Sequence, residues 1–439
     1  MFNKNTISFF LSNKRLINNI KHLSIQNFLL ATIQIFYPPL LILFWGIDNY
    51  ALWLTCVASI NLLCAFQISH SEVIKKELAY SYVNNNKKFI LILTNSFFLS
   101  VLNSIILTIS SAIFIKLFHL PGIFESVINS NDTKILIFIL LVCNYLKVIK
   151  NFYYPVLTFQ GDLKRLTTIN SFFELSHRLL ILTLAFLDQN IVIITLFYFF
   201  CELLQTLIYF YYYKKYNKFI LIDLSYFNIK LILKYLNLSL GFSIEQVSNN
   251  LKNNFFYFLL GIYSNSLVIS LFSTARTIFY YMPIQIGSIV STASVAEYYQ
   301  KKIKNKKKNI LQDLNKYIFL SIFLLIIFII FSILAGKQIY KIWINNPLLN
   351  ISNEIILLLT LEASFFVIRG FLASAMMAFH KIIYVTLPEL ASIVLSTILC
   401  IVLLYYLKNY ILIFYVHTIV FGLYTLIIYF FTRNFLIKK

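Results

Sequence analysis

Charged residues are scarce in this sequence. Asp, Glu, Lys and Arg together make up 12% of the 439 residues, whereas a soluble domain carries about 25%. The hydrophobic fraction is 60%, and the mean hydropathy is +0.80. A soluble core of this size could not bury so much apolar surface, so lipid must be the solvent for most of the chain. The composition therefore excludes an ordinary soluble domain.

Cysteine and the common catalytic motifs are scarce or absent as well. The cysteines all fall in apolar runs and never show CxxC spacing, so neither a disulfide framework nor a zinc site is expected. The sequence also lacks GxxxxGK(S/T), HExxH, GxSxG and GxGxxG. We therefore expect no cofactor, no metal and no enzymatic activity. The cysteines are Cys56, Cys64, Cys143, Cys201 and Cys400.

Long apolar runs dominate the rest of the chain. A helix needs about 20 residues to cross the hydrocarbon core, and about twelve runs reach that length. The connections between them are short, so no extramembrane domain fits. We predict an all-α polytopic membrane protein with about twelve transmembrane helices in two six-helix bundles. The expected spans are 23–45, 51–70, 89–115, 134–155, 166–187, 190–212, 237–262, 266–295, 314–335, 354–379, 383–407 and 411–432.

Lysine and arginine predict the orientation, because cytoplasmic loops are enriched in both. One set of alternate loops is rich in them, and the other holds only Lys116, Lys134, Lys337, Lys341 and Lys408. The rich set includes both termini, so we expect both to be cytoplasmic. Residues 1–22 are polar and basic, which is unlike a cleavable signal peptide. The basic block 301–308 could bind nucleic acid, but topology and attraction to anionic lipid explain it, so no nucleic-acid partner is expected.

The layout of the spans repeats at an offset of roughly 215–220 residues, which indicates two parallel halves. The basic segments 71–88 and 297–313 occupy corresponding places. We predict a bundle over 23–212, a connecting segment over 213–236 that is partly helical on the cytoplasmic face, and a second bundle over 237–432. Residues 1–22 and 433–439 are the cytoplasmic ends.

Charges inside the spans are the most informative feature, because each costs at least a few kcal/mol at the bilayer centre. Glu174 and Arg178 are four residues apart and can pair, for either a structural or a functional purpose. Glu202 has no obvious partner and could be a neutral acid or a proton-coupling site. The cations are Arg178, Lys252, Arg276 and Arg369, and the acids are Glu174, Glu202, Glu245, Glu362 and Glu389.

The seventh span is the most polar and includes Glu245, Asn249, Lys252 and Asn253. Such a stripe cannot face lipid, so it lines a wet cavity between the halves or bonds to other helices. Lys252 and Arg276 have no acid three or four residues away, so local pairing does not explain either cation. Arg276 could instead snorkel or pair with an acid on another helix.

Several local motifs resemble a known family. The first motif reads Tyr37-Pro38-Pro39-Leu40-Leu41 through Gly46, followed by Tyr50-Ala51-Leu52-Trp53. It is similar to the first hairpin of the polysaccharide flippases. These are the Wzx-type O-antigen and exopolysaccharide translocases of the MATE-like MOP superfamily. Two later motifs also resemble the family. The signature of its seventh and eighth spans resembles Leu260-Gly261-Ile262-Tyr263 with Phe272-Ser273-Thr274-Ala275-Arg276, and the start of its ninth-to-tenth loop resembles Gly336 with Ile342-Trp343. The family often has an Asp-x-Gly turn after the second span, where this chain has Gln67-Ile68-Ser69-His70-Ser71-Glu72.

The resemblance implies a transporter that flips an undecaprenyl-pyrophosphate-linked oligosaccharide from the inner to the outer leaflet by alternating access, for lipopolysaccharide or other surface polysaccharide biosynthesis. Its partners would be that substrate, membrane lipids and the polysaccharide polymerase machinery. Cations suit a pyrophosphate, so the expected residues of the substrate-binding cavity include Lys252, Arg276 and Arg369. The others are Glu245, Asn249 and Asn253. Glu174, Arg178, Glu202 and Glu362 are expected to be coupling or structural charges.

Two other functions remain open at this point. A MATE-type exporter has the same fold but takes mainly cationic drugs, which favour an acidic cavity. A membrane polysaccharide polymerase or ligase would need an acid or base in a sizeable outside loop. The longest outside loop, 116–133, offers only His119, Glu125 and Asp132, which a solvated loop also explains.

Overall fold

The computed structural model describes residues 14–64, 67–68, 70–71, 73–75, 77–78, 86–118, 130–159, 163–216, 223–303, 307–379, 381–407 and 409–437. Parts of several sequence-based predictions lie outside these residues. They include 1–13 of the N-terminal segment, the turn residues Ser69 and Glu72, the loop residues His119 and Glu125, half of the basic segment 71–88, and 304–306 of the basic block.

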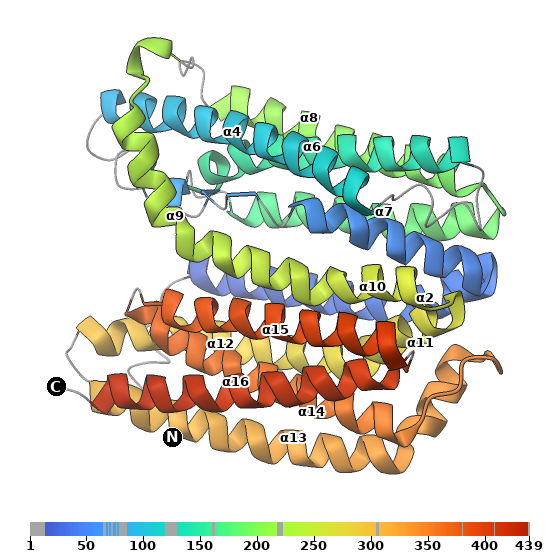
Figure 1. Cartoon of the computed structure of the whole chain (residues 1–439). Coiled ribbons are helices and arrows are strands. Elements are labelled where there is room, and N and C mark those ends of the chain that lie inside the picture. Colours follow the sequence, from blue (N-terminus) through green and yellow to red (C-terminus); the bar gives the residue numbers. More distant parts are fainter. Residues whose placement is uncertain are drawn as a thin grey trace. The chain divides into compact units, whose positions relative to one another are not determined.

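The described residues form helices and no strands, as predicted (Figure 1). The α-helices are α2 (Lys14–Cys64), α4 (Asn86–Phe118), α6 (Ser130–Phe159), α7 (Leu163–Phe186), α8 (Ile191–Tyr216), α9 (Ile229–Asn250), α10 (Phe256–Tyr263), α11 (Ser266–Arg276), α12 (Met282–Ile303), α13 (Lys307–Ile344), α14 (Asn353–Ala378), α15 (Ile383–Leu407) and α16 (Ile411–Ile437). A 3-10 turn, η1 (Leu224–Tyr226), precedes α9. Two π-helical turns, η2 (Leu251–Phe255) and η3 (Thr277–Tyr281), link α9 to α10 and α11 to α12.

Within the described residues, nine helices are long and apolar enough to cross a membrane. This count is lower than the predicted number of spans for two reasons. The first two predicted spans form the single helix α2, which changes direction at Gly46, where φ is +80°. The segments 166–187 and 237–262 are helical but are not among the nine, because polar side chains lower their hydropathy. The predicted all-α membrane fold is confirmed.

The chain divides into two compact units. Unit 1 comprises 1–45 and 66–243, and unit 2 comprises 46–65 and 244–439. The helices α2 and α9 therefore each contribute residues to both units. These two units are defined by contacts in one conformation, whereas the predicted halves come from a repeat in the layout of the spans. The two six-span halves therefore stay a prediction.

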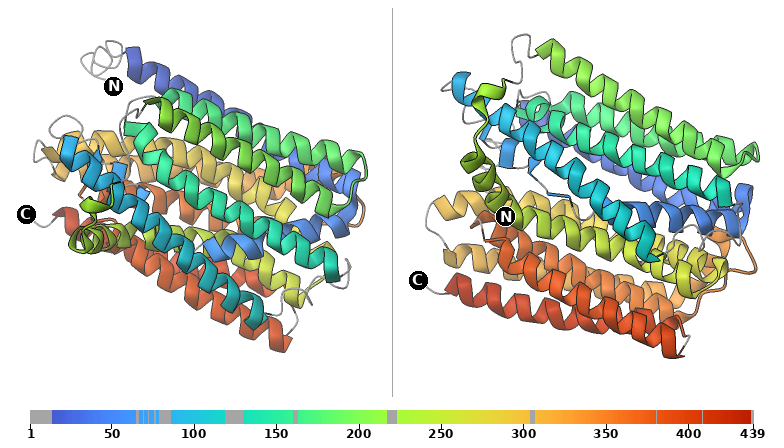
Figure 2. Two further views of the ribbon diagram at one scale, coloured as in Figure 1. Left: turned by 90° about the horizontal axis from the view of Figure 1, so that it is seen from above. Right: turned by 45° about the horizontal axis from the view of Figure 1, so that its top comes forward.

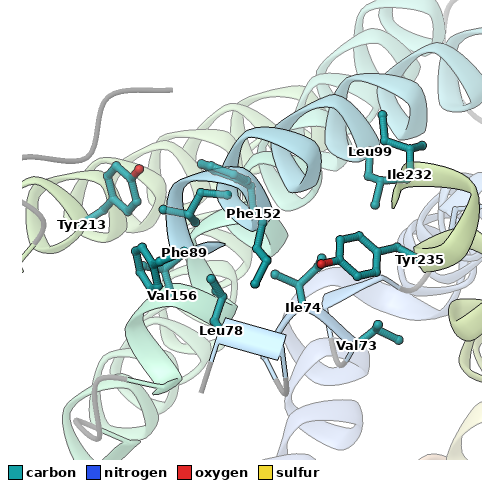
Figure 3. Close-up of a cluster of buried hydrophobic side chains, with 12 residues drawn as sticks. Val73, Ile74, Leu78, Phe89, Leu99, Phe152, Val156, Tyr213, Ile232 and Tyr235 are labelled. Carbon is teal, nitrogen blue, oxygen red and sulfur yellow. The ribbon is translucent and has the colours of Figure 1, made fainter. Parts of the chain in front are cut away.

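Unit 1 contains α4, α6, α7 and α8, with α6 packed against both α4 and α8 (Figure 2). Its core includes Val73, Ile74 and Leu78 from the segment after α2, packed with side chains from α4, α6, α8 and α9 (Figure 3). This apolar cluster brings the start of α9 against α4. The amide of Asn95 strengthens the contact, because Nδ2 donates to the Tyr226 carbonyl (3.0 Å) and Oδ1 accepts from the Asn228 N–H (2.9 Å).

Unit 2 packs α14 against α12, α13 and α16 (Figure 1). The part of α2 that follows Gly46 belongs to this unit, and the Tyr50 hydroxyl lies 2.8 Å from Ser273 Oγ on α11. The π turn η3 is followed by α12, whose second residue is Pro283. Proline has no N–H and crowds the carbonyl four residues earlier, so a widened turn is expected just before it.

Candidate functional site

The polar stripe of the predicted seventh span runs along α9 and through the π turn η2. Glu245, Asn249, Lys252 and Asn253 are all half-buried. The Lys252 ammonium donates to Asn249 Oδ1 (3.3 Å) and lies 3.9 Å from the ring centroid of Phe366 on α14. An aromatic face attracts a cation that has lost part of its water, which helps to keep this lysine charged inside an apolar bundle.

Arg369 on α14 forms ion pairs across helices. Its Nη2 contacts Glu389 Oε2 on α15 and lies 3.7 Å from Glu245 Oε1 on α9. The side chain of Glu389 is fully buried, so the arginine supplies the charge that such a carboxylate requires. The structure therefore joins two predicted site residues, Glu245 and Arg369, and adds Glu389. The sequence showed Glu389 as an acid within a span, but its partner lies 20 positions earlier in the chain.

Arg276, the last residue of α11, is more deeply buried than the other predicted cations. Only 2% of its surface is exposed, and its guanidinium carbon lies 4.5 Å from the Tyr280 ring centroid and 5.1 Å from that of Phe272. Within the described part of the chain, its Nε and Nη1 atoms have no hydrogen-bond partner. Buried N–H groups without acceptors are costly, so the burial of this arginine is only partly compensated.

A small cavity lies beside Arg276 and includes another predicted residue, Glu362. It is lined by Phe256, Phe272, Arg276, Glu362, Ile413, Phe414 and His417. His417 Nδ1 lies 3.2 Å from Glu362 Oε1, and both side chains are buried. Sequence reasoning did not identify His417, because it lies on α16, 55 residues from its partner.

These groups interact with one another within unit 2. Lys252 lies within electrostatic range of Arg276, Arg369, Glu362 and Glu389. Neither Lys252 nor Arg276 forms an ion pair with any residue that the structure describes. The site thus combines one arginine neutralised by two carboxylates with two cations that have no carboxylate partner.

The remaining predicted charges lie in unit 1. Glu174 and Arg178 form the expected pair along α7, with Nη2 and Oε1 2.8 Å apart. Glu202 on α8 does have a partner, contrary to the sequence-based expectation, since Lys150 on α6 contacts its carboxylate. Lys150 was not among the cations expected inside the spans, although it falls within the span 134–155. A separation of 52 residues hides this pair from any argument based on local spacing.

No protein-family model matches the chain, and no curated protein matches it. Solved structures do match. The inward closed form of MurJ, a lipid II flippase, is similar with a TM-score of 0.68 at 17% identity, over 93% of this chain and 86% of that chain. An inward-facing multidrug resistance MATE family transporter of the MOP superfamily gives 0.60 at 14% identity, over 95% and 98%. A MOP superfamily transporter from Pyrococcus furiosus, described as having a binding pocket of reversed polarity, gives 0.55 at 13% identity, over 95% of each chain. This multi-pass membrane protein therefore has the fold of the MOP superfamily transporters.

Proposed function

We propose that this chain flips an undecaprenyl-pyrophosphate-linked oligosaccharide from the inner to the outer leaflet of a bacterial plasma membrane, for surface polysaccharide biosynthesis. The main support is a pair of cations in unit 2, Lys252 and Arg276, that have no carboxylate partner among the described residues. Cations kept inside spans at a cost of a few kcal/mol each suit an anionic substrate. The likeness to MurJ, itself a lipid II flippase, agrees with a lipid-linked substrate.

The two cations would contribute differently to binding. A guanidinium can bind a phosphate through two parallel hydrogen bonds, whereas an ammonium acts as a point charge. Arg276 Nε and Nη1 have no hydrogen-bond partner among the described residues. Lys252 is half-buried and contacts the Asn249 amide oxygen and the Phe366 ring. Arg369 is committed to two carboxylates, so it would join the site only if Glu245 or Glu389 released it.

A MATE-type exporter of cationic drugs is the second candidate, supported by the similar MATE structures. Such a substrate needs a carboxylate that is free to receive it. Glu245 and Glu389 are instead paired with Arg369, and Glu362 contacts His417. The charge arrangement in unit 2 therefore favours an anionic substrate over a cationic one.

Transport in proteoliposomes tests the proposal. We expect purified protein to move a radiolabelled lipid-linked oligosaccharide between leaflets, and Lys252→Ala to lower the rate at least tenfold while Lys252→Arg retains part of it. Lys337→Ala, which removes an exposed lysine on α13, is the matched control and should transport normally. Movement of a cationic dye but not of the lipid-linked sugar would favour the exporter instead.

The proposal extends to orientation and partners. Both termini would be cytoplasmic, so that the substrate is taken up on the side where the lysine-rich loops lie. The polymerase that extends the oligosaccharide would act on the opposite face. Hydrolysis of the substrate during the assay, rather than its intact movement, would indicate an enzyme.

A further inference from the structure

A second polar network lies within unit 1, separate from the cations of unit 2. It follows one face of α8, where Tyr198, Glu202, Gln205 and Tyr209 recur at helical spacing. The helices α6 and α7 both pack against α8 (Figure 1). Lipid offers no hydrogen-bond partners, so a stripe of this kind must find them on the neighbouring helices.

Glu202 is the centre of this network and is only 4% exposed. The Lys150 ammonium contacts its Oε2 atom and also donates to Gln205 Oε1 at 2.6 Å. The Tyr198 hydroxyl donates to the other carboxylate oxygen at 3.3 Å. Lys150 therefore binds two acceptors on successive turns of one helix, and one of them is a carboxylate.

A second set of bonds fixes the amide of Gln205. Its Nε2 donates to Asn170 Oδ1 on α7 (3.0 Å), and the Tyr209 hydroxyl donates to the same oxygen. This arrangement orients Gln205 Oε1 toward Lys150. Gln205 Oε1 is thus held close to the Glu202 carboxylate, where it can accept a hydrogen bond from Lys150 or from another donor.

We propose that Glu202 is a proton-binding site and that Lys150 is an internal cation that occupies the carboxylate whenever the proton is absent. An ionised carboxylate left alone in a span costs several kcal/mol. If Lys150 withdraws, Glu202 therefore takes a proton from water and forms an O–H bond. Gln205 Oε1, which Lys150 has vacated, accepts the hydrogen bond from that O–H. The return of Lys150 releases the proton to water.

The charges around Glu202 favour its ionised form in the arrangement described here. On α6, Lys147 adds a second cation one turn from Lys150, and on α7, Glu174 is already paired with Arg178. His177 on α7, which is 7% exposed, packs against Tyr198 with ring centroids 4.8 Å apart and ring planes tilted by 41°. Cations therefore exceed acids around Glu202 and keep it ionised while Lys150 is in place. The other titratable neighbours are Cys143, Cys201 and Tyr209.

A metal cation fits this place less well than a proton. Hard cations require several oxygen ligands, but Asn170 Oδ1 already accepts two hydrogen bonds. Of this network, Glu202, Gln205 and the Tyr198 hydroxyl would remain to provide oxygens, which is fewer than such a cation usually takes. Among the described residues, no cluster of His, Cys, Asp and Glu suits a metal ion.

Infrared difference spectroscopy of the purified full chain tests the proton site without any transported substrate. Lowering the pH should produce the C=O band of a protonated carboxylic acid in an apolar environment. We expect Glu202→Gln to lose this band and Glu354→Gln, which changes an exposed carboxylate on α14, to keep it. A band that persists unchanged in Glu202→Gln would overturn the assignment, as would a band that sodium suppresses at constant pH.

A double variant separates proton binding from a purely structural ion pair. Replacing a buried pair with apolar residues of similar volume is often neutral for stability, so Lys150→Met/Glu202→Leu should fold. We expect it to resist heating as the parent does, but to lose the acceleration of transport that a pH gradient gives. A folded double variant with the parental gradient response would show that the pair is only structural.

The assigned role in transport depends on the proposed function, but the spectroscopic measurement does not. A chain that shows the Glu202 band yet fails to move the lipid-linked sugar would retain the proton site and reject the flippase function. A chain that moves the lipid-linked sugar but lacks the Glu202 band would retain the flippase function and reject the proton site.

Discussion

Arg276 shows how a buried cation can be retained without an ion pair. Three aromatic rings, from Phe272, Tyr280 and Tyr281, lie within 4.5–5.1 Å of its guanidinium. Their faces carry partial negative charge and replace some of the lost hydration. Among the described residues, however, its Nε and Nη1 atoms have no hydrogen-bond partner.

Graded replacement of Arg276 tests its role in transport. Because lysine keeps the charge but not the paired donors, Arg276→Lys should retain part of the flipping rate, and Arg276→Ala should lose nearly all of it. The amount of protein in the membrane should stay the same. Transport assays in vesicles with matched protein levels provide the measurement.

A companion variant distinguishes binding from neutralisation. If Arg276 served only to balance Glu362, which lines the same cavity, then Arg276→Ala/Glu362→Gln would recover transport. We expect no recovery. Normal export by Arg276→Ala, or failure caused only by loss of the protein, would also contradict the assignment.

Sequence reasoning at this scale identified the costly residues but not their partners. Lys252, Arg276 and Arg369 were recognisable because charges in apolar runs require a reason. Glu174 and Arg178 were recognisable as a pair because they are adjacent on one helix face. The contacts of Arg369 with Glu389, of Glu202 with Lys150 and of Glu362 with His417 all join different helices, so no local spacing encodes them.

Among the elements, α12 and α14 approach closely at Gly287. A Cβ atom at this position would lie 2.7 Å from Val367 Cγ1 and 2.8 Å from Cγ2. Valine is stiff about χ1 and cannot easily turn both methyl groups away. The absence of a side chain at Gly287 therefore sets the separation of these two helices.

Gly287→Ala should lower the thermal stability in detergent. Alanine gains about 1 kcal/mol of helix propensity over glycine, but overpacking a closely packed contact costs about 1–3 kcal/mol, so we expect a net loss. Adding Val367→Ala should relieve the clash, and the double-mutant cycle measures the coupling. Gly370→Ala is the control, because its nearest neighbour is Ser291 Oγ at 3.3 Å. Equal melting temperatures for all variants would show that the helices are not in close contact.

The elements themselves were largely predictable, because long apolar runs can only be helices in lipid. The joins between them were less so. Nothing in the residue pattern indicated that α2 continues through Gly46 or that α9 passes into a π turn at Leu251. These features depend on how the neighbouring helices pack, which the hydropathy of the sequence does not indicate.

For the whole molecule, orientation is the property that the lysine pattern predicts and that the fold leaves open. We expect Asn309→Cys to resist a membrane-impermeant thiol reagent in intact cells and Asn350→Cys to react with it. Both positions are exposed on the protein surface, so the membrane alone should make the difference. The native cysteines are replaced by alanine in both variants, and permeabilised cells provide the control, in which both should react. Labelling of Asn309→Cys alone in intact cells would reverse the topology.

The sequence by itself determined that this protein spans a membrane, that it is helical, and that a few charged residues lie within its spans at an energetic cost. Each of these follows from the cost of exposing polar groups to lipid, which depends on composition and local order. Only the tertiary structure decided which charges neutralise one another and which remain available. That outcome depends on contacts between helices far apart in the chain. It leaves Lys252 and Arg276 without carboxylate partners among the described residues, while Arg369 and Glu202 are paired.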